Sequence, residues 1–264
     1  MDTAPIRHPD FENPPVVETV LGVQFAPVPG LTPLHFGLFW HAMRTEFPTS
    51  EIKEPLLDLA SLGAPITTFP IRAWFHDAAK VYLVQLQNDR LILNWRKKDS
   101  EDGVVYPHYD VIRPRFHAIL ERLSAFLVQE GLAPLTAMLC EVTYIDHISD
   151  SDIKDVAERG GELFKYWSGG PTDYLREGTT TSFSVAVTMP NQIDSVTLQM
   201  QPVRDLASAA LIQQLRFSAL CRPVSNTTAD ILDALDRAHD LEVRAFLEFT
   251  SEQLQERWGR KDLQ

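Results

Sequence analysis

One stretch of the sequence combines basic and aromatic side chains. Arg96 follows Trp95, and Tyr106 and Tyr109 lie shortly downstream. A guanidinium beside aromatic rings can hold a planar or anionic ligand through its charge and through cation–π contact. We predict that any ligand site lies here. The favoured interpretation of this stretch is nevertheless a solvated hairpin end, because three acidic residues follow between positions 99 and 102 and offset the positive charge.

Two further residues could contribute to a polar ligand site. Glu18 interrupts an apolar stretch, and a buried carboxylate is costly unless it pairs with a cation or binds a ligand. His147 ends the run Tyr144–His147 and could act as a general base. Successive strand side chains point to opposite faces, so we do not expect Asp146 to orient His147. The simpler interpretation is a solvated or paired Glu18 and a histidine at a polar strand end.

The sequence carries no signal for metal or nucleophile chemistry. His35 and His41 are six residues apart on an expected helix, whereas metal ligands on a helix prefer a spacing of three or four. Gly-rich phosphate loops and nucleophile-elbow motifs are absent from the sequence. Cys140 and Cys221 lie in apolar runs, which predicts free thiols in a reducing compartment. We therefore predict no metal and no cofactor.

The composition indicates a globular protein. Of the 264 residues, 44% are hydrophobic and 23% are charged, which is enough apolar material for a large core. The formal net charge of -12 disfavours general binding to nucleic-acid phosphates. No apolar run approaches the ~20 residues of a membrane span, and no basic and apolar leader opens the chain. We predict a cytoplasmic protein that does not bind membranes.

Hydrophobic periodicity and turn residues predict the elements of the first half. A strand over residues 16–25 precedes a helix that begins after Thr32 and ends before Pro48. The residues expected on or near the apolar stripe of this helix are Leu34, Leu38, Met43 and Phe47. A loop with several prolines follows over residues 54–70. Three short antiparallel strands and then a strongly amphipathic helix complete this half, over residues 71–76, 80–87, 90–96 and 113–130.

The second half repeats this order of elements. Expected strands cover residues 136–148, 182–189, 195–203 and 209–220, and a helix is expected over residues 150–167. A single long helix is expected over residues 229–258. On that helix we predict that His239 is a core histidine. The acid-rich run Glu242–Glu256 is interpreted as a solvated face or as half of a helix–helix interface.

The fold class that follows is α+β. We predict two similar βαβββα halves, residues 1–134 and 135–264, with a largely antiparallel curved sheet and helices on one face. An internal duplication and one continuous sheet without an ancestral repeat both remain open. The opposite sheet face, or a cleft between the halves, would be the natural ligand surface.

Several short motifs carry a family resemblance. The opening Asn13–Glu18 with Gly22–Phe25 resembles the start of a sporadically distributed bacterial protein family of unknown function. Asn94–Arg96, Glu141–Ile145 and a C-terminal helix ending near Trp258 are also similar to that family. The resemblance implies no catalytic residue.

The best functional hypothesis is a non-catalytic binding or interaction protein. It would hold a small ligand or a protein partner at the cleft or sheet face between its halves, and it could form a homodimer. One alternative is a metal-independent hydrolase or nucleotide-modifying enzyme with His147 or Glu18 as base. Another is an accessory protein of a bacterial defence or toxin system, an idea prompted by the patchy distribution of the resembling family.

Overall fold

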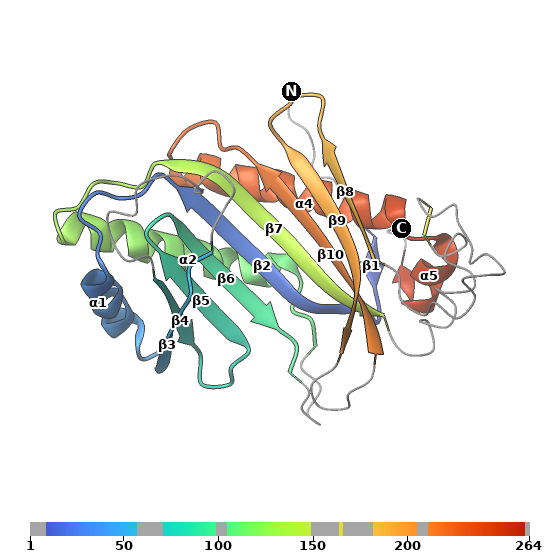
Figure 1. Cartoon of the computed structure of the whole chain (residues 1–264), viewed down its shortest axis with the longest axis horizontal. Coiled ribbons are helices and arrows are strands. Elements are labelled where there is room, and N and C mark those ends of the chain that lie inside the picture. The colour runs from blue at the N-terminus through green and yellow to red at the C-terminus, as the bar shows by residue number, and fades with distance from the viewer. Residues whose placement is uncertain are drawn as a thin grey trace. The chain divides into compact units, whose positions relative to one another are not determined.

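The structure is a computed structural model that describes residues 9–56, 71–98, 105–148, 164–165, 182–204 and 211–261 (Figure 1). The described helices are α1 (Pro33–Met43), α2 (Tyr109–Gln129), α4 (Thr228–Phe249) and α5 (Glu252–Arg257). None of these helices is both long and apolar enough to cross a lipid bilayer. The described strands are β1 (Asp10–Phe11), β2 (Val16–Phe25), β3 (Thr49–Lys53), β4 (Arg72–His76), β5 (Tyr82–Gln87), β6 (Arg90–Arg96), β7 (Ala137–Ile148), β8 (Phe183–Thr188), β9 (Ser195–Arg204), β10 (Leu211–Cys221) and β11 (Arg260–Lys261).

Most of the strands belong to one large sheet. Its strand order is β3-β4-β5-β6-β2-β7-β10-β9-β8, and β1 pairs with β11 in a separate ribbon. The ladders β3–β4, β4–β5, β5–β6, β8–β9 and β9–β10 are antiparallel. The predicted α+β class is therefore confirmed.

The chain divides into two compact units. Unit 1 contains residues up to Glu18, Val142–Leu220 and Asp236 onward, and unit 2 contains Thr19–Glu141 and Cys221–Leu235. Both β2 and β7 contribute residues to each unit. The units differ from the predicted halves 1–134 and 135–264, because residues up to Glu18 join unit 1 and residues 135–141 and 221–235 join unit 2. An origin by duplication stays a prediction.

In unit 2 the two helices α1 and α2 cover one face of the strands, and α2 lies behind them in Figure 1. Alternation on β4 turns Ala73 and Phe75 toward the helices, where both are buried. The Phe39 ring of α1 lies 6.3 Å from the Phe75 ring and 5.4 Å from the Phe126 ring of α2. The predicted stripe of α2 is buried, including Phe116, Ile119, Leu120 and Leu123.

Replacing Phe126 with alanine should lower the free energy of unfolding by roughly 3–5 kcal/mol, because it empties the space between α2 and Phe39. Urea unfolding followed by circular dichroism measures the loss. A loss below about 1 kcal/mol would contradict this packing of α2.

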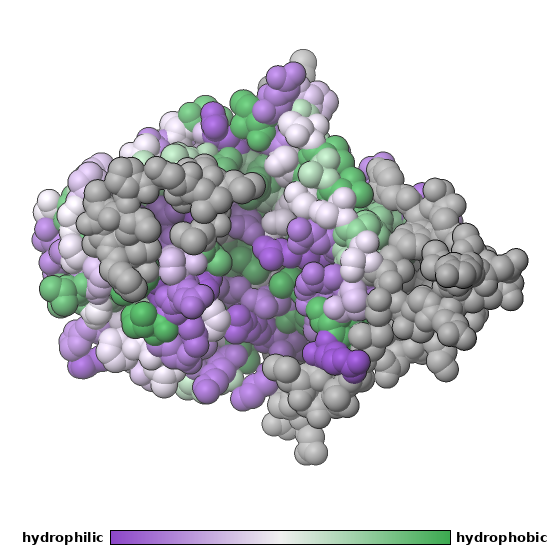
Figure 2. Space-filling model, viewed as in Figure 1, coloured by the Kyte–Doolittle hydropathy of each residue, from purple (hydrophilic) through white to green (hydrophobic). Residues whose placement is uncertain are grey.

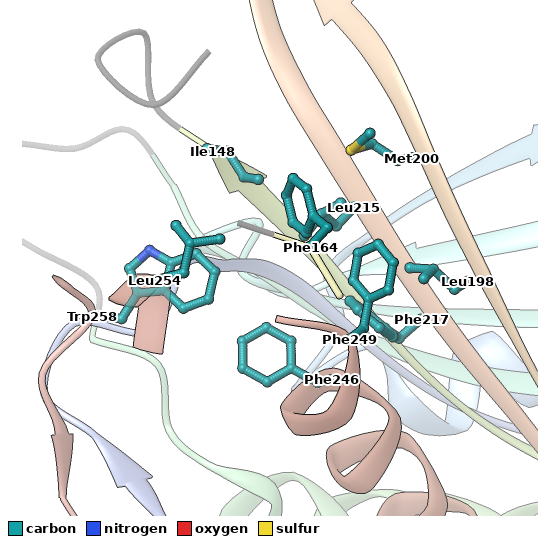
Figure 3. Packing of buried hydrophobic residues seen from close by; sticks show 10 residues of the cluster. All are labelled: Ile148, Phe164, Leu198, Met200, Leu215, Phe217, Phe246, Phe249, Leu254 and Trp258. Atoms are coloured by element: carbon teal, nitrogen blue, oxygen red, sulfur yellow. The ribbon is translucent and has the colours of Figure 1, made fainter. Parts of the chain in front are cut away.

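In unit 1 the core lies between strands β7–β10 and the second part of α4. Figure 3 shows side chains from the strands and from the two C-terminal helices converging on one cluster. The ring centroids of Phe217 and Phe249 are 5.9 Å apart, and those of Phe164 and Phe249 are 5.0 Å apart. The cluster consists of Ile148, Phe164, Leu198, Met200, Leu215, Phe217, Phe246, Phe249, Leu254 and Trp258.

Three expectations about the elements were wrong. The first half contains an additional strand, β3, at the edge of the sheet. Leu34 and Leu38 are exposed, and Phe36 and Phe39 are buried in their place, whereas Met43 and Phe47 are buried as expected. The helix over residues 229–258 is two helices, because the Ser251 side chain accepts the backbone N–H of Leu254 and starts α5. The helix expected over residues 150–167 lies outside the described residues apart from positions 164–165.

Candidate functional site

The helix-free face of unit 2 is formed by alternate residues of β3, β4, β5 and β6. Antiparallel register places Lys53 opposite Arg72, Trp74 opposite Gln85, and Leu83 opposite Asn94. Directly opposite residues share a face, so these side chains lie on the side away from Ala73 and Phe75. Figure 2 shows this side of the molecule, with hydrophilic residues gathered on it. The strands thus pack an apolar face against the helices, and their other face carries mostly polar side chains, of which His76, Gln85 and Asn94 are buried.

A single indole ring is surrounded by cations on this face. The distances to the Trp74 ring centroid are 5.0 Å from the Lys53 Nζ, 5.3 Å from the Arg72 Cζ and 5.3 Å from the Arg96 Cζ. The three cations come from β3, β4 and β6, so only the folded sheet brings them together. All four residues are half-buried. We call Lys53, Arg72, Trp74 and Arg96 the Trp74 cluster.

A ladder of buried amides supports the cluster. The Arg72 Nη1 donates to the Gln85 Oε1 at 3.0 Å, and the Gln85 Nε2 donates to the Asn94 Oδ1 at 2.6 Å. Gln85 and Asn94 are 5% and 3% exposed. Because buried amides are costly to leave unpaired, these bonds fix the direction of the Arg72 guanidinium.

Two buried donors of the cluster lack an acceptor among the residues that the structure describes. The Arg72 Nε and the Trp74 Nε1 are inaccessible to solvent and have no hydrogen-bond partner among the described residues. Most buried polar atoms in folded proteins are hydrogen-bonded, so two neighbouring exceptions require an explanation. Each of these N–H groups is able to donate to an added acceptor.

The Arg72 guanidinium lies among other cations. Burial, followed by the charges of Arg90 and Arg96, lowers the pKa of Arg72, so its cation lies in an unfavourable environment. Of the neighbouring acids, Glu51 contacts Lys53 at 2.5 Å and Asp89 contacts Arg90 at 2.9 Å. In the described part of the chain, no carboxylate forms an ion pair with Arg72. The arrangement can therefore attract and orient an anion.

The structure separates the basic and aromatic residues that the sequence grouped. Arg96 belongs to the Trp74 cluster, whereas Trp95 points to the opposite face of β6 and is 1% exposed. The Trp95 ring contacts the Tyr106 ring edge-on at 5.3 Å, and Tyr109 is buried at the start of α2. Trp95, Tyr106 and Tyr109 thus lie outside the Trp74 cluster.

Glu18 and His147 lie in unit 1, and both are half-buried. The His147 Nε2 lies 3.3 Å from the Gln214 Oε1. Asp146 is buried and lies on the opposite face of β7. As expected from strand alternation, Asp146 does not orient His147. The interpretation of Glu242–Glu256 as a solvated face was wrong at Glu242, which is 3% exposed because it faces the strands.

Metal ligands do not assemble in the described residues, where no group of three or more His, Cys, Asp or Glu could hold a metal ion. The His35 Nδ1 lies 2.9 Å from the Thr32 Oγ1 and accepts the Thr32 N–H at 3.1 Å, so His35 closes the first turn of α1. His41 lies near Arg44 on the same helix. Cys140 and Cys221 are buried free thiols.

The fold and the cluster together define an α+β protein with a cationic and aromatic sheet face in unit 2. No protein-family model matches the chain, and no curated protein matches it. The resemblance to a sporadically distributed bacterial family therefore stays a prediction.

Proposed function

We propose that the protein is a non-catalytic binding protein that holds a small organic anion at the Trp74 cluster. The observation that carries the proposal is the meeting of three cations at one indole ring, together with two buried donors that have no acceptor in the described part of the chain. A carboxylate or phosphate oxygen would accept from the Arg72 Nε and the Trp74 Nε1. The same oxygen would offset the repulsion among the cations.

The chemistry of the cluster favours an anion over a neutral ligand. Arg72 and Arg96 present planar guanidinium groups, which can bind carboxylates or phosphates with two hydrogen bonds. Lys53 adds a point charge at the rim. His147 bonds Gln214 in unit 1, so we propose no catalytic base.

Isothermal titration calorimetry with benzoate, inorganic phosphate and adenosine monophosphate at constant ionic strength tests the proposal. We expect saturable binding of at least one probe. Arg72→Gln and Arg96→Ala should each weaken that binding by about tenfold or more, because each removes a charge-assisted hydrogen bond. Lys98→Ala is the matched control, because it also removes one positive charge and exposed Lys98 bonds the Ala79 carbonyl.

Equal affinity in the wild type and both arginine variants would overturn the proposed site. Native mass spectrometry of protein purified from its own host provides a second test. A mass above 29.9 kDa that is lost in Arg72→Gln would support a bound anion. Absence of binding to all three probes together with a bare native mass would contradict the proposed function.

A further inference from the structure

Two acidic side chains meet between β7 and α4 inside unit 1. Alternation on β7 turns Tyr144, Asp146 and Ile148 toward α4. The Tyr144 hydroxyl lies 3.3 Å from the Nδ1 of His239, and Ile148 belongs to the cluster that contains Phe246. Asp146 therefore lies between these two contacts. Helical periodicity places Glu242, three residues after His239 and four before Phe246, on the same side of α4.

Both carboxyl groups are removed from water. Asp146 is 1% exposed and Glu242 is 3% exposed. Neither carboxylate oxygen of Asp146 has a hydrogen-bond partner among the described residues. An ionised carboxylate in such a place loses its hydration without compensation, which costs several kcal/mol. The neutral, protonated form of Asp146 is therefore the form that fits the packed structure.

Among the described residues, the groups that face the pair do not form an ion pair with Asp146. On α4 the nearest titratable residue of that face is His239, and on β7 it is Tyr144, which contacts His239. β10 turns the neutral residues Gln213 and Leu215 toward the core. The adjacent acid Asp240 pairs with Arg244 at 2.9 Å. No described lysine or arginine hydrogen-bonds to Asp146.

The electrostatics agree with this geometry. Burial raises the pKa of Asp146 to about 7. Burial, and then the charge of Asp146, raises the pKa of Glu242 well above its ordinary value. Each ionised carboxylate therefore disfavours ionisation of the other.

We propose that Asp146 and Glu242 form a proton-dependent latch that holds the second part of α4 on β7 within unit 1. In the protonated state the two elements pack with Tyr144–His239 on one side and Ile148 with Phe246 on the other. Loss of the protons places two like charges in an apolar contact. The contact then opens to admit water, and residues 236–249 separate from residues 142–148.

Hydrogen exchange measured by mass spectrometry at about pH 5.5 and about pH 8.5 tests the latch, with rates corrected for intrinsic exchange. In the wild type the protection of residues 236–249 should fall by about tenfold or more at the higher pH. Asp146→Asn keeps the shape of the side chain without its charge. In this variant the protection of residues 236–249 should fall less than about twofold between the two pH values. Glu248→Gln, on an exposed position of the same helix, should behave as the wild type.

If Asp146→Asn does not fold, the variant Glu242→Gln and infrared spectroscopy of the carboxyl groups still test the latch. Glu242→Gln should also reduce the loss of protection at high pH. In infrared spectra, the band of a protonated carboxylic acid should persist in the wild type at about pH 6 and be weaker in Glu242→Gln. An equal loss of protection in the wild type and both variants would overturn the latch. So would the absence of a protonated carboxyl band at that pH.

Discussion

As the pH rises from about 4 to about 7, the free energy of unfolding of the wild type should fall by more than that of the variant Asp146→Asn. The pKa of the buried Asp146 carboxyl rises from its ordinary 3.8 to about 7 on folding. The folded state therefore binds more protons than the unfolded state in this window. The stabilisation by the protonated Asp146 carboxyl is fully present below the pKa of this group in the unfolded chain. It is lost as the pH rises through the pKa of the group in the folded protein. A rise of about three units in the pKa of Asp146 corresponds to a loss of roughly 4 kcal/mol in the free energy of unfolding.

Urea unfolding at a series of pH values measures this effect as a difference between two proteins. Other carboxyl groups titrate in the same range, so the comparison of wild type with Asp146→Asn isolates the buried group. Glu248→Gln controls for removing an exposed carboxylate from α4. Parallel stability profiles for the wild type and Asp146→Asn would show that Asp146 is ionised in the folded protein.

Replacing Phe249 with alanine should cost roughly 3–5 kcal/mol of stability, because its ring lies at the centre of the unit 1 core. Phe249 is 1% exposed, and its ring centroid lies 5.0 Å from that of Phe164, 5.4 Å from that of Phe183 and 5.9 Å from that of Phe217. Removing it leaves a cavity and ends three ring contacts. Urea unfolding at about pH 5.5, where the Asp146 carboxyl is largely protonated, measures the loss.

An exposed apolar residue of the same unit is the control for this substitution. Ile193 is 48% exposed in the turn between β8 and β9, so Ile193→Ala should change the stability by less than about 0.5 kcal/mol. A loss below about 1 kcal/mol for Phe249→Ala would mean that the ring is not packed as described.

Local signals in the sequence were sufficient for several elements. The strands β4, β5 and β6 were predicted because alternation and short turns determine a hairpin within a few residues. The Asp77 side chain accepts the backbone N–H groups of Val81 and Tyr82, which fixes the first of these turns. The apolar stripe of α2 was equally clear, since it repeats over several turns with the helical period.

Other elements depend on contacts that are distant in sequence. The edge strand β3 has the sequence Thr-Ser-Glu-Ile-Lys and is mostly exposed, so it shows no apolar alternation. Its assignment comes from pairing with β4. The break between α4 and α5 was missed because the periodicity continues through Thr250, whose hydroxyl bonds the carbonyl of Phe246. A helix end of this kind depends on a single capping residue, so the hydrophobic pattern of the sequence does not reveal it.

The site was also predicted only in part, because its residues are distant in sequence and meet only in the folded sheet. Arg96 was identified from its basic and aromatic neighbours, but the ring it contacts is Trp74, two strands away. The alternation of Arg72, Trp74 and His76 with Ala73 and Phe75 was the signal that could have indicated a polar face. The burial of Asp146 and Glu242 had no such signal, because only the packing of α4 on β7 removes both from water.

The anion-binding proposal is tested most directly by the indole N–H resonance of Trp74 in a ¹⁵N–¹H spectrum, assigned with Trp74→Phe. The Trp74 Nε1 has no acceptor among the described residues, whereas the Trp40 Nε1 donates to the Phe47 carbonyl and serves as an internal control. Titration with benzoate, phosphate or adenosine monophosphate should shift the Trp74 resonance saturably and leave that of Trp40 in place. The shift should disappear in Arg72→Gln. A Trp74 resonance that does not respond to any of the three anions would contradict the proposed site.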